Sequence, residues 1–383
     1  MSDPVTTLGL AYGRYGNTPF GIRQGDRLQH LYVIGQTGSG KSTLLYNMAC
    51  QDAAQGIGFC LIDPHGDLAR DIERSSPSDA IIWTVGDPDC PYGYNPLTRT
   101  TVPLRPLVTS GLIEAFRKQW ADAWGVRMEH LLRYAILALL DRPHTNLSEI
   151  MRLFLDRAFR TNVLAGIEDP QVRQFWFEEF PAMNYKTAAD GVAPIANKIG
   201  TFLSHPVVRH AVCEPKEPLR FRQIMDEGRV LIINLSKGQI GADIANVLGG
   251  LIVSAITHAA FTRQDSQSRR MFALYVDEFH NFTTEALADT LSESRKYGLS
   301  LTLAQQHAQQ STEGLFAGIM GNVGSLIAFR LGATDAPIFA RQLGDVAPET
   351  LIKLPNYQTH LKLMVDGAQT KSFTAFMYPP RAP

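Results

Sequence analysis

The amino-acid sequence predicts an α/β fold in which a mostly parallel central sheet is interrupted by an inserted all-helical domain. Short apolar runs bounded by turn residues recur towards both ends of the chain. They lack polar alternation, as strands buried on both faces do. Between these two regions the apolar residues repeat with helical spacing instead. The 383 residues suffice for one large domain with an insertion.

The first part of the chain predicts a strand, a loop and a helix in direct succession. Residues 30–34 form an apolar run that ends at Gly35, and residues 41–54 follow with helix-forming residues and helical spacing. Two further strands are predicted at 57–62 and 80–85, each closed by a turn sequence that contains Asp, Pro and Gly.

The middle of the chain contains no clear strand, and the predicted strands resume after it. Helical periodicity extends from about 103 to 222. Apolar strand-like runs then return, and the last two read as a terminal hairpin around Asp366-Gly367; the runs are 230–235, 272–276, 299–304, 325–329, 361–365 and 372–377. We therefore expect a discontinuous domain of residues 1–102 and 223–383, with 103–222 as the helical insertion.

The loop after the first strand fits the pattern GxxxxGK[ST] of phosphate-binding loops. Its backbone N–H groups and the following helix N-terminus would face a phosphate chain. Lys41 would reach the β- and γ-phosphates, Ser42 would ligate Mg²⁺, and Thr43 would support the first helical turn. The alternative is a glycine-rich turn with a solvated lysine. The predicted ATP-binding residues are Gly35, Gln36, Thr37, Gly38, Ser39, Gly40, Lys41, Ser42 and Thr43.

An acidic pair ends the predicted strand 272–276. Ligands of open α/β sheets bind at the carboxyl ends of the strands. There Asp277 can hold Mg²⁺ through water, and Glu278 can orient and polarise the attacking water. The alternative is an ordinary strand end followed by an acidic helix N-terminus. Together with Lys41, the two adjacent carboxylates favour hydrolysis of a nucleotide over binding alone. We therefore expect the sheet to form a RecA-like P-loop NTPase core.

Two polar residues elsewhere are candidates for roles in catalysis. Gln306 follows the strand 299–304 and could sense the γ-phosphate, with Gln305 as its rival and an ordinary exposed glutamine as the alternative. Arg295, at the end of a predicted helix, could reach a neighbouring subunit as an arginine finger. The alternative for Arg295 is a basic helix end that complements the helix dipole. Arg330 is a second candidate, for which structural pairing is the preferred interpretation.

The bulk composition limits the location and the partners of the protein. The 36 basic and 37 acidic residues nearly cancel, so contacts with a nucleic acid must be local. The four cysteines form no CxxC pair, and no export signal is recognisable. The longest apolar run, 247–261, is shorter than a bilayer-spanning helix needs. We expect a buried helix there, no integral membrane segment, and a cytoplasmic protein that is at most peripheral to a membrane complex.

Taken together, these motifs resemble those of the HerA-FtsK superfamily, and among its members the coupling-protein ATPases of conjugation and type IV secretion. The resemblance spans nearly the whole chain. It rests on seven segments, of which only the phosphate-binding loop is specific by itself: residues 30–43 (HLYVIGQTGSGKST), 58–68 (GFCLIDPHGDL), 94–97 (YNPL), 274–279 (LYVDEF), 294–298 (SRKYG), 304–306 (AQQ) and 329–336 (FRLGATDA).

The resemblance implies a homohexameric ring that moves DNA through its pore, with an all-α domain inserted in a RecA-like motor. By position, Lys41 and Ser42 match the first nucleotide motif, Asp277 and Glu278 the second, Arg295 the finger and Gln306 the sensor. The implied partners are DNA and DNA-processing or secretion-channel proteins. The sequence thus predicts an ATP-driven DNA translocase of conjugation or of a mobile element. Alternatives are an ATPase for protein secretion or genome packaging, and an ATP-dependent assembly switch without translocation.

Overall fold

The computed structural model describes residues 4–98, 100–183, 185–283, 286–344 and 346–379. The chain divides into two compact units. The first comprises Met1–Ile82, Arg220–Leu235 and Ala259–Pro383, and the second comprises Trp83–Leu219 and Ser236–His258. Two of the boundaries between the units fall inside elements, one in a strand and one in a helix. Each unit is described by itself.

The first unit is built on a mixed, mostly parallel sheet of eleven strands in the order β2-β1-β15-β12-β11-β3-β10-β9-β4-β8-β5. The central strands β11, β3, β10, β9, β4 and β8 are parallel. These six strands and β5 coincide closely with the predicted apolar runs: β3 (Leu31–Ile34), β4 (Gly58–Asp63), β5 (Ile81–Thr84), β8 (Val230–Asn234), β9 (Phe272–Val276), β10 (Leu299–Gln305) and β11 (Ser325–Ala328).

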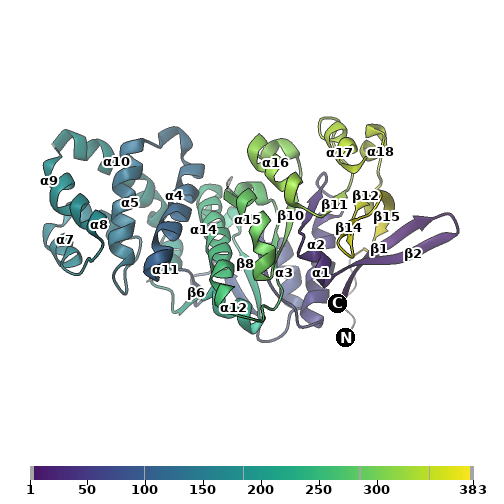
Figure 1. Ribbon diagram of the computed structural model, residues 1–383, viewed down its shortest axis with the longest axis horizontal. Helices are drawn as coiled ribbons and strands as arrows, with labels where there is room; N and C mark the ends of the chain where they lie inside the picture. The colour runs from purple at the N-terminus through teal and green to yellow at the C-terminus, as the bar shows by residue number, and fades with distance from the viewer. Residues whose placement is uncertain (1–3, 99, 184, 284–285, 345, 380–383) are drawn as a thin grey trace. The chain divides into compact units, whose positions relative to one another are not determined.

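Antiparallel strands extend the sheet beyond β11. Strand β12 (Gln358–Lys362) pairs with β11 and with β15 (Phe373–Met377), which confirms the terminal hairpin. Its first strand begins three residues before the predicted start at 361. The turn at Asp366-Gly367 joins the short strands β13 (Met364–Val365) and β14 (Ala368–Gln369). The sequence analysis missed β1 (Val5–Gly13) and β2 (Gly16–Arg23), a hairpin that projects from the sheet in Figure 1.

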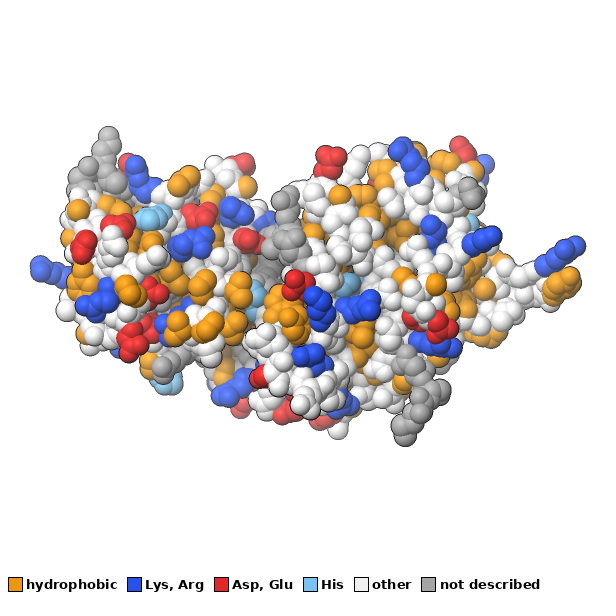
Figure 2. Space-filling model, in the orientation of Figure 1, with side chains coloured by type: hydrophobic (Ala, Val, Ile, Leu, Met, Phe, Trp, Pro, Cys, Tyr) orange, Lys and Arg blue, Asp and Glu red, His pale blue; other side chains and the backbone are white. Residues whose placement is uncertain are grey.

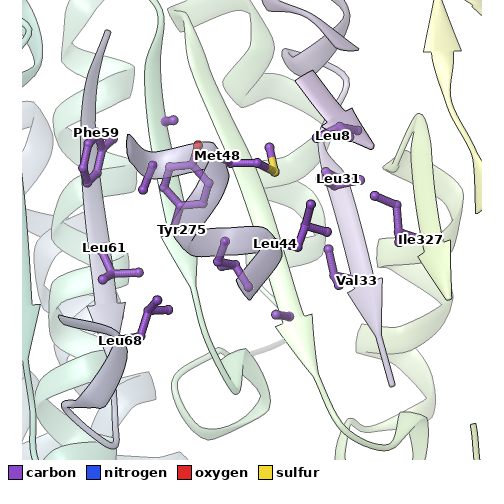
Figure 3. Packing of buried hydrophobic residues seen from close by; sticks show 14 of the residues in the cluster. Leu8, Leu31, Val33, Leu44, Met48, Phe59, Leu61, Leu68, Tyr275 and Ile327 are labelled. Carbon is purple, nitrogen blue, oxygen red and sulfur yellow. The ribbon is translucent and has the colours of Figure 1, made fainter. Parts of the chain in front are cut away.

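Helix α2 packs its apolar residues against the sheet and anchors the loop that precedes it. It spans Lys41–Ala54, as predicted. Figure 3 shows Leu44 and Met48 of α2 among strand residues that include Leu31, Val33 and Leu61, all of them almost fully buried. The remaining helices of this unit are α1 (Gln24–Arg27), α3 (Asp67–Arg74), α12 (Phe221–Glu227), α15 (Ala286–Ser294), α16 (Glu313–Asn322), α17 (Ala336–Leu343) and α18 (Pro348–Ile352).

The second unit is mainly helical (Figure 1). Its short strands β6 (Tyr92–Gly93) and β7 (Glu217–Pro218) pair with each other in parallel. Our boundaries for the helical insertion, 103–222, remain a prediction. The helices that begin within those bounds before Arg220 are α4 (Arg105–Gln119), α5 (Val126–Leu140), α6 (Glu149–Leu155), α7 (Arg157–Leu164), α8 (Pro170–Gln174), α9 (Phe180–Ala182), α10 (Tyr185–Ser204) and α11 (Pro206–Cys213).

Helix α14 (Ala242–Phe261) follows the short α13 (Lys237–Ile240) and begins five residues before the apolar run that predicted it. Among the described residues, one helical stretch, Ala242–Asp265, is long and apolar enough to cross a membrane. In the protein 67% of its apolar window is buried. Such burial is what a core helix requires, in agreement with the buried helix that we expected here.

Candidate functional site

The loop between β3 and α2 adopts a conformation that its glycines make accessible. Gly38 and Gly40 have φ angles of 74° and 125°, in the region that side chains disfavour. A Cβ on Gly40 would lie 2.9 Å from the ring of Phe329 and 3.0 Å from the ring of Tyr357. The hydroxyl of Ser39 donates to the carbonyl of Gln36 over 2.6 Å and closes the loop. The loop is therefore a tight backbone cradle at the start of α2.

Lys41 lies inside this cradle rather than in solvent. Its side chain is buried, and Nζ donates to the carbonyl of Gly35 over 2.6 Å and to that of Gln36 over 3.4 Å. Burial lowers the pKa of Lys41, while the nearby carboxylates of Glu278 and Asp277 act in the opposite direction. This placement excludes the solvated lysine that was the alternative for this motif.

Asp277 and Glu278 follow β9 directly, and both are buried. Burial raises the pKa of Asp277 to about 7, and the charges of Glu278 and Asp63 add to that rise. Glu278 has a φ of 48°, a left-handed conformation that is rare for a residue with a side chain. Such strain is typical of residues whose position the surrounding fold imposes, and it is frequent in functional sites.

Gln306 connects Glu278 to the phosphate-binding loop. Its Nε2 donates to Oε1 of Glu278 over 2.8 Å, and its Oε1 accepts from the hydroxyl of Thr37 over 2.9 Å. The rival, Gln305, is fully buried and bonds instead to the hydroxyls of Tyr32 and Ser311. Of the two glutamines, Gln306 therefore faces the site.

A cavity of about 670 Å³ joins these residues within the first unit. Asp63, at the end of β4, lines it and also accepts from the backbone N–H groups of His65 and Ala69 at the start of α3. Gly35, Gln36 and Ser39 belong to the loop but are not part of the cavity wall. The predicted site residues that line the cavity are Thr37, Gly38, Gly40, Lys41, Ser42, Thr43, Asp277, Glu278 and Gln306.

Residues 12–256, more than half of the chain, match the family model described as the central domain of the helicase HerA. The chain belongs to the HerA central-domain family. It is thus a P-loop ATPase of the HerA-FtsK superfamily, as the motifs had indicated. No curated protein matches this HerA-family chain by sequence.

Solved structures show where the fold of this HerA-family chain recurs. The bacterial conjugative coupling protein TrwBΔN70 matches with a TM-score of 0.67 and 16% identity, over 94% of this chain and 87% of that chain. TrwB in complex with ADP and Mg²⁺ matches with a TM-score of 0.68 and 16% identity over the same shares. VirB4 of Thermoanaerobacter pseudethanolicus matches with a TM-score of 0.70 and 14% identity, over 98% and 96%. At these identities the likeness concerns the fold, which is RecA-like with a helical insertion.

Arg295 of the HerA-family chain does not join the cavity of its own chain. It begins a 3-10 turn, Arg295–Tyr297, that leads into β10, and its side chain is exposed. It lies near His30, which precedes β3, whereas the phosphate-binding loop follows β3. Because β3 and β10 are parallel, Arg295 is at the opposite edge of the sheet from Lys41. Arg295 is therefore not placed to contact a nucleotide bound in the cavity of its own chain, and its role as a finger stays a prediction.

Arg330 supports the phosphate-binding loop from the side of β11. Its Nε donates to Oε1 of Gln36 over 3.2 Å, and its backbone carbonyl accepts from the N–H of Gln36 over 2.9 Å. A further bond of 3.4 Å reaches the carbonyl of Leu354. These contacts agree with structural pairing, the interpretation that the sequence favoured for Arg330.

Nine residues of the cavity wall were not among the predicted site residues, and Asp63, Tyr46 and Tyr357 are three of them. Asp63 carried a signal, because it ends an apolar strand beside a turn. For that segment we weighed a place near the nucleotide or the subunit boundary but preferred a structural turn. Tyr46 lies on α2, where its hydroxyl bonds to Oγ of Ser75 over 2.9 Å. Tyr357 comes from the segment before β12, far along the chain from the loop, and nothing in its local sequence points to the site.

Proposed function

We propose that this HerA-family chain hydrolyses ATP to move DNA, as a ring oligomer in conjugation or in the transfer of a mobile element. The observation that carries the proposal is the convergence of Lys41, Glu278 and Gln306 on one cavity. Hydrolysis of a phosphoanhydride needs a cation that binds the phosphates and a carboxylate that orients the attacking water. Lys41 and Glu278 supply these groups, and the amide of Gln306 lies between them.

The residues of the cavity fit a nucleoside triphosphate with Mg²⁺. Oε2 of Glu278 is buried, makes no hydrogen bond among the described residues and lies 3.5 Å from Nδ1 of His280, so it keeps capacity to accept a proton from water. Ser42 and Asp277 would hold the metal ion, whose charge would offset the carboxylates that crowd Asp277. No cluster of three metal-binding side chains occurs in the described part of the chain. This suits Mg²⁺, which takes few protein ligands and completes its shell with phosphate and water.

The chain's own residues then divide the work of hydrolysis. Lys41 exchanges its bonds to the loop carbonyls for phosphate oxygens. Glu278 orients the attacking water through Oε2 and polarises it, while its other oxygen, Oε1, is held by Gln306. Since Gln306 also bonds to Thr37, a displacement of the loop by the γ-phosphate would be transmitted to Glu278.

The likeness to TrwB, a bacterial conjugative coupling protein, supports the proposed role in conjugation. The exposed Arg295 suits a homohexamer in which each finger serves the neighbouring site. Basic and acidic side chains are interspersed over the face in Figure 2. Contact with DNA would therefore rely on a few basic residues that the ring brings together at its pore.

The cell compartment and further partners follow as proposals. We place the protein in the cytoplasm, at most peripheral to a membrane complex. There it would receive DNA from processing proteins and deliver it to a channel.

The test is ATP turnover with and without DNA. Strong stimulation of turnover by DNA, together with displacement of a triplex-forming strand from a long duplex or of a bound protein from single-stranded DNA, supports the translocase. Stimulation by a partner protein alone supports the assembly switch. Turnover that a secretion substrate stimulates and DNA does not would point to protein secretion.

A further inference from the structure

One aromatic side chain of the cavity wall, that of Tyr357, has no role in the proposed hydrolysis. Tyr357 lines the cavity, and its backbone N–H donates to the carbonyl of Ser39 over 2.8 Å. An added Cβ on Gly40 would meet Cδ1 of Tyr357 at 3.0 Å. The Tyr357 ring therefore lies directly against the phosphate-binding loop.

The backbone of Tyr357 is held in an unfavourable conformation. Its φ is 64°, which costs free energy in any residue other than glycine. The carbonyl of Tyr357 accepts from the N–H of Met377 over 2.8 Å, and Phe376 packs edge-on against its ring. The fold thus fixes both the backbone and the ring of a half-buried tyrosine at the mouth of the loop.

Sheet topology places Tyr357 across the loop from the catalytic candidates. Strand β3 has β10 on one side and β11 on the other. Glu278 and Gln306 follow β9 and β10, on the first side. Tyr357 precedes β12, which runs antiparallel to β11, so it lies at the edge where β3 ends but on the second side. If the γ-phosphate points to Glu278, the nucleoside end of the chain would then lie on the side of Tyr357.

We propose that Tyr357 is the nucleobase-binding residue of the site, and that the purine of the bound nucleotide stacks on its ring. The proposal rests on the proposed ATPase function. Every base has a flat π-face, and an aromatic ring held at a fixed distance from the phosphates binds it with little loss of side-chain freedom.

Tyr46 is the other tyrosine of the cavity, but its surroundings suit a base less well. Its hydroxyl is bonded to Ser75, and the cavity wall beside it carries the carboxylates of Asp67 and Asp71. It also lies near α3 and β4, on the same side of the phosphate-binding loop as Asp277 and Glu278. Tyr46 therefore serves as the matched comparison for Tyr357.

The experiment measures binding of a non-hydrolysable ATP analogue and of inorganic tripolyphosphate by calorimetry, both with Mg²⁺. Tyr357→Ala should weaken binding of the analogue about 10-fold and leave tripolyphosphate binding unchanged, since only the base contact is lost. Tyr357→Phe should bind both ligands like the wild type. Tyr357→Leu, which keeps bulk against Gly40 but has no π-face, should behave like Tyr357→Ala. Thermal unfolding without ligand checks that each variant is folded.

Three results overturn the inference. One is an analogue affinity in Tyr357→Ala and Tyr357→Leu that equals the wild-type value. A second is an equal loss of affinity for both ligands in these variants, which would indicate damage to the loop. The third is a selective loss in Tyr46→Ala with none in Tyr357→Ala. Failure of the wild type to bind either ligand would instead contradict the proposed ATPase function. Lys41→Ala should bind neither ligand, so it shows what loss of the phosphate site looks like in the same measurement.

Discussion

The amide of Gln306 lies 2.8 Å from the carboxylate of Glu278 and holds one of its two oxygens in place. The same amide bonds to Thr37, so the residue proposed to orient water and the loop proposed to bind phosphate share one side chain. Loss of this side chain should leave nucleotide binding largely intact and disturb hydrolysis.

We expect Gln306→Ala to lower kcat about 10- to 100-fold with KM for ATP changed less than about 3-fold, because Glu278 loses its orienting bond. Steady-state ATP turnover measures both constants. Gln309→Ala, in the same segment but exposed, is the matched control and should behave like the wild type. Equal turnover of the two variants would remove Gln306 from the mechanism.

Glu278→Gln should abolish most hydrolysis while ATP remains bound, with turnover reduced about 10²- to 10⁴-fold. The amide keeps the shape of the side chain but cannot accept the proton of water. Rapid filtration with labelled ATP measures retention, and phosphate release measures turnover. Lys41→Ala should instead lose binding itself. Wild-type phosphate release by Glu278→Gln would show that this carboxylate is not the base.

Arg295→Ala should reduce turnover about 10³-fold or more if the arginine acts on a neighbouring site. Mixing offers a sharper measurement. Arg295→Ala subunits keep an intact cavity, and Lys41→Ala subunits keep Arg295, so a mixture should regain activity that neither variant has alone. Lys296→Ala, at the adjacent exposed position, is the control. Normal hydrolysis by Arg295→Ala at high protein concentration would contradict the assignment.

His30 should make the stability of the protein sensitive to acid. The ring is buried: Nδ1 accepts from the N–H of Leu301 over 3.1 Å, and Nε2 lies 2.9 Å from the carbonyl of Leu291. Burial lowers the pKa of His30 to about 4. The unfolded chain takes up a proton near pH 6.5 and the folded protein does not. The contribution of His30 to stability is therefore fully present above pH 6.5 and is lost as the pH falls towards 4.

We expect His30→Gln to cost about 1–3 kcal/mol at pH 7, because a buried hydrogen-bonding pattern is disturbed. It should also make the decline in the free energy of unfolding between pH 6.5 and 4 less steep. Urea unfolding at several pH values measures both effects. His144→Gln, at an exposed position, should keep the wild-type slope. An unchanged slope in His30→Gln would mean that this ring titrates normally.

The parallel core could be predicted because its strands are buried on both faces. Such strands are uninterrupted apolar runs, and 272–276 coincides with β9 from end to end. The hairpin of β1 and β2 could not be predicted in this way. Its strands contain glycine, threonine and proline, and β1 is held in the sheet by pairing with β15 from the other end of the chain. Pairing between such distant segments leaves no local pattern.

The same distinction separates the predictable from the unpredictable part of the site. Lys41 and the acidic pair carry local signals, since a loop motif and a strand end define them. The choice of Gln306 over Gln305 depends on which way each side chain points, and that alternates along a strand. Asp63 and Tyr357 meet the site only because β4 lies beside β9 and β12 beside β11. Strand order is a property of the whole fold, so single segments do not reveal it.

The bond between Lys41 and the carbonyl of Gly35 has a consequence for the kinetics of nucleotide capture. The ammonium of Lys41 bonds to the backbone of its own loop, so a phosphate that binds there competes with the carbonyls of Gly35 and Gln36 for it. This competition lowers the net gain in free energy when a phosphate binds. Release of the hydrolysis product should be faster as a result, because Lys41 can bond again to the carbonyl of Gly35 as the product leaves.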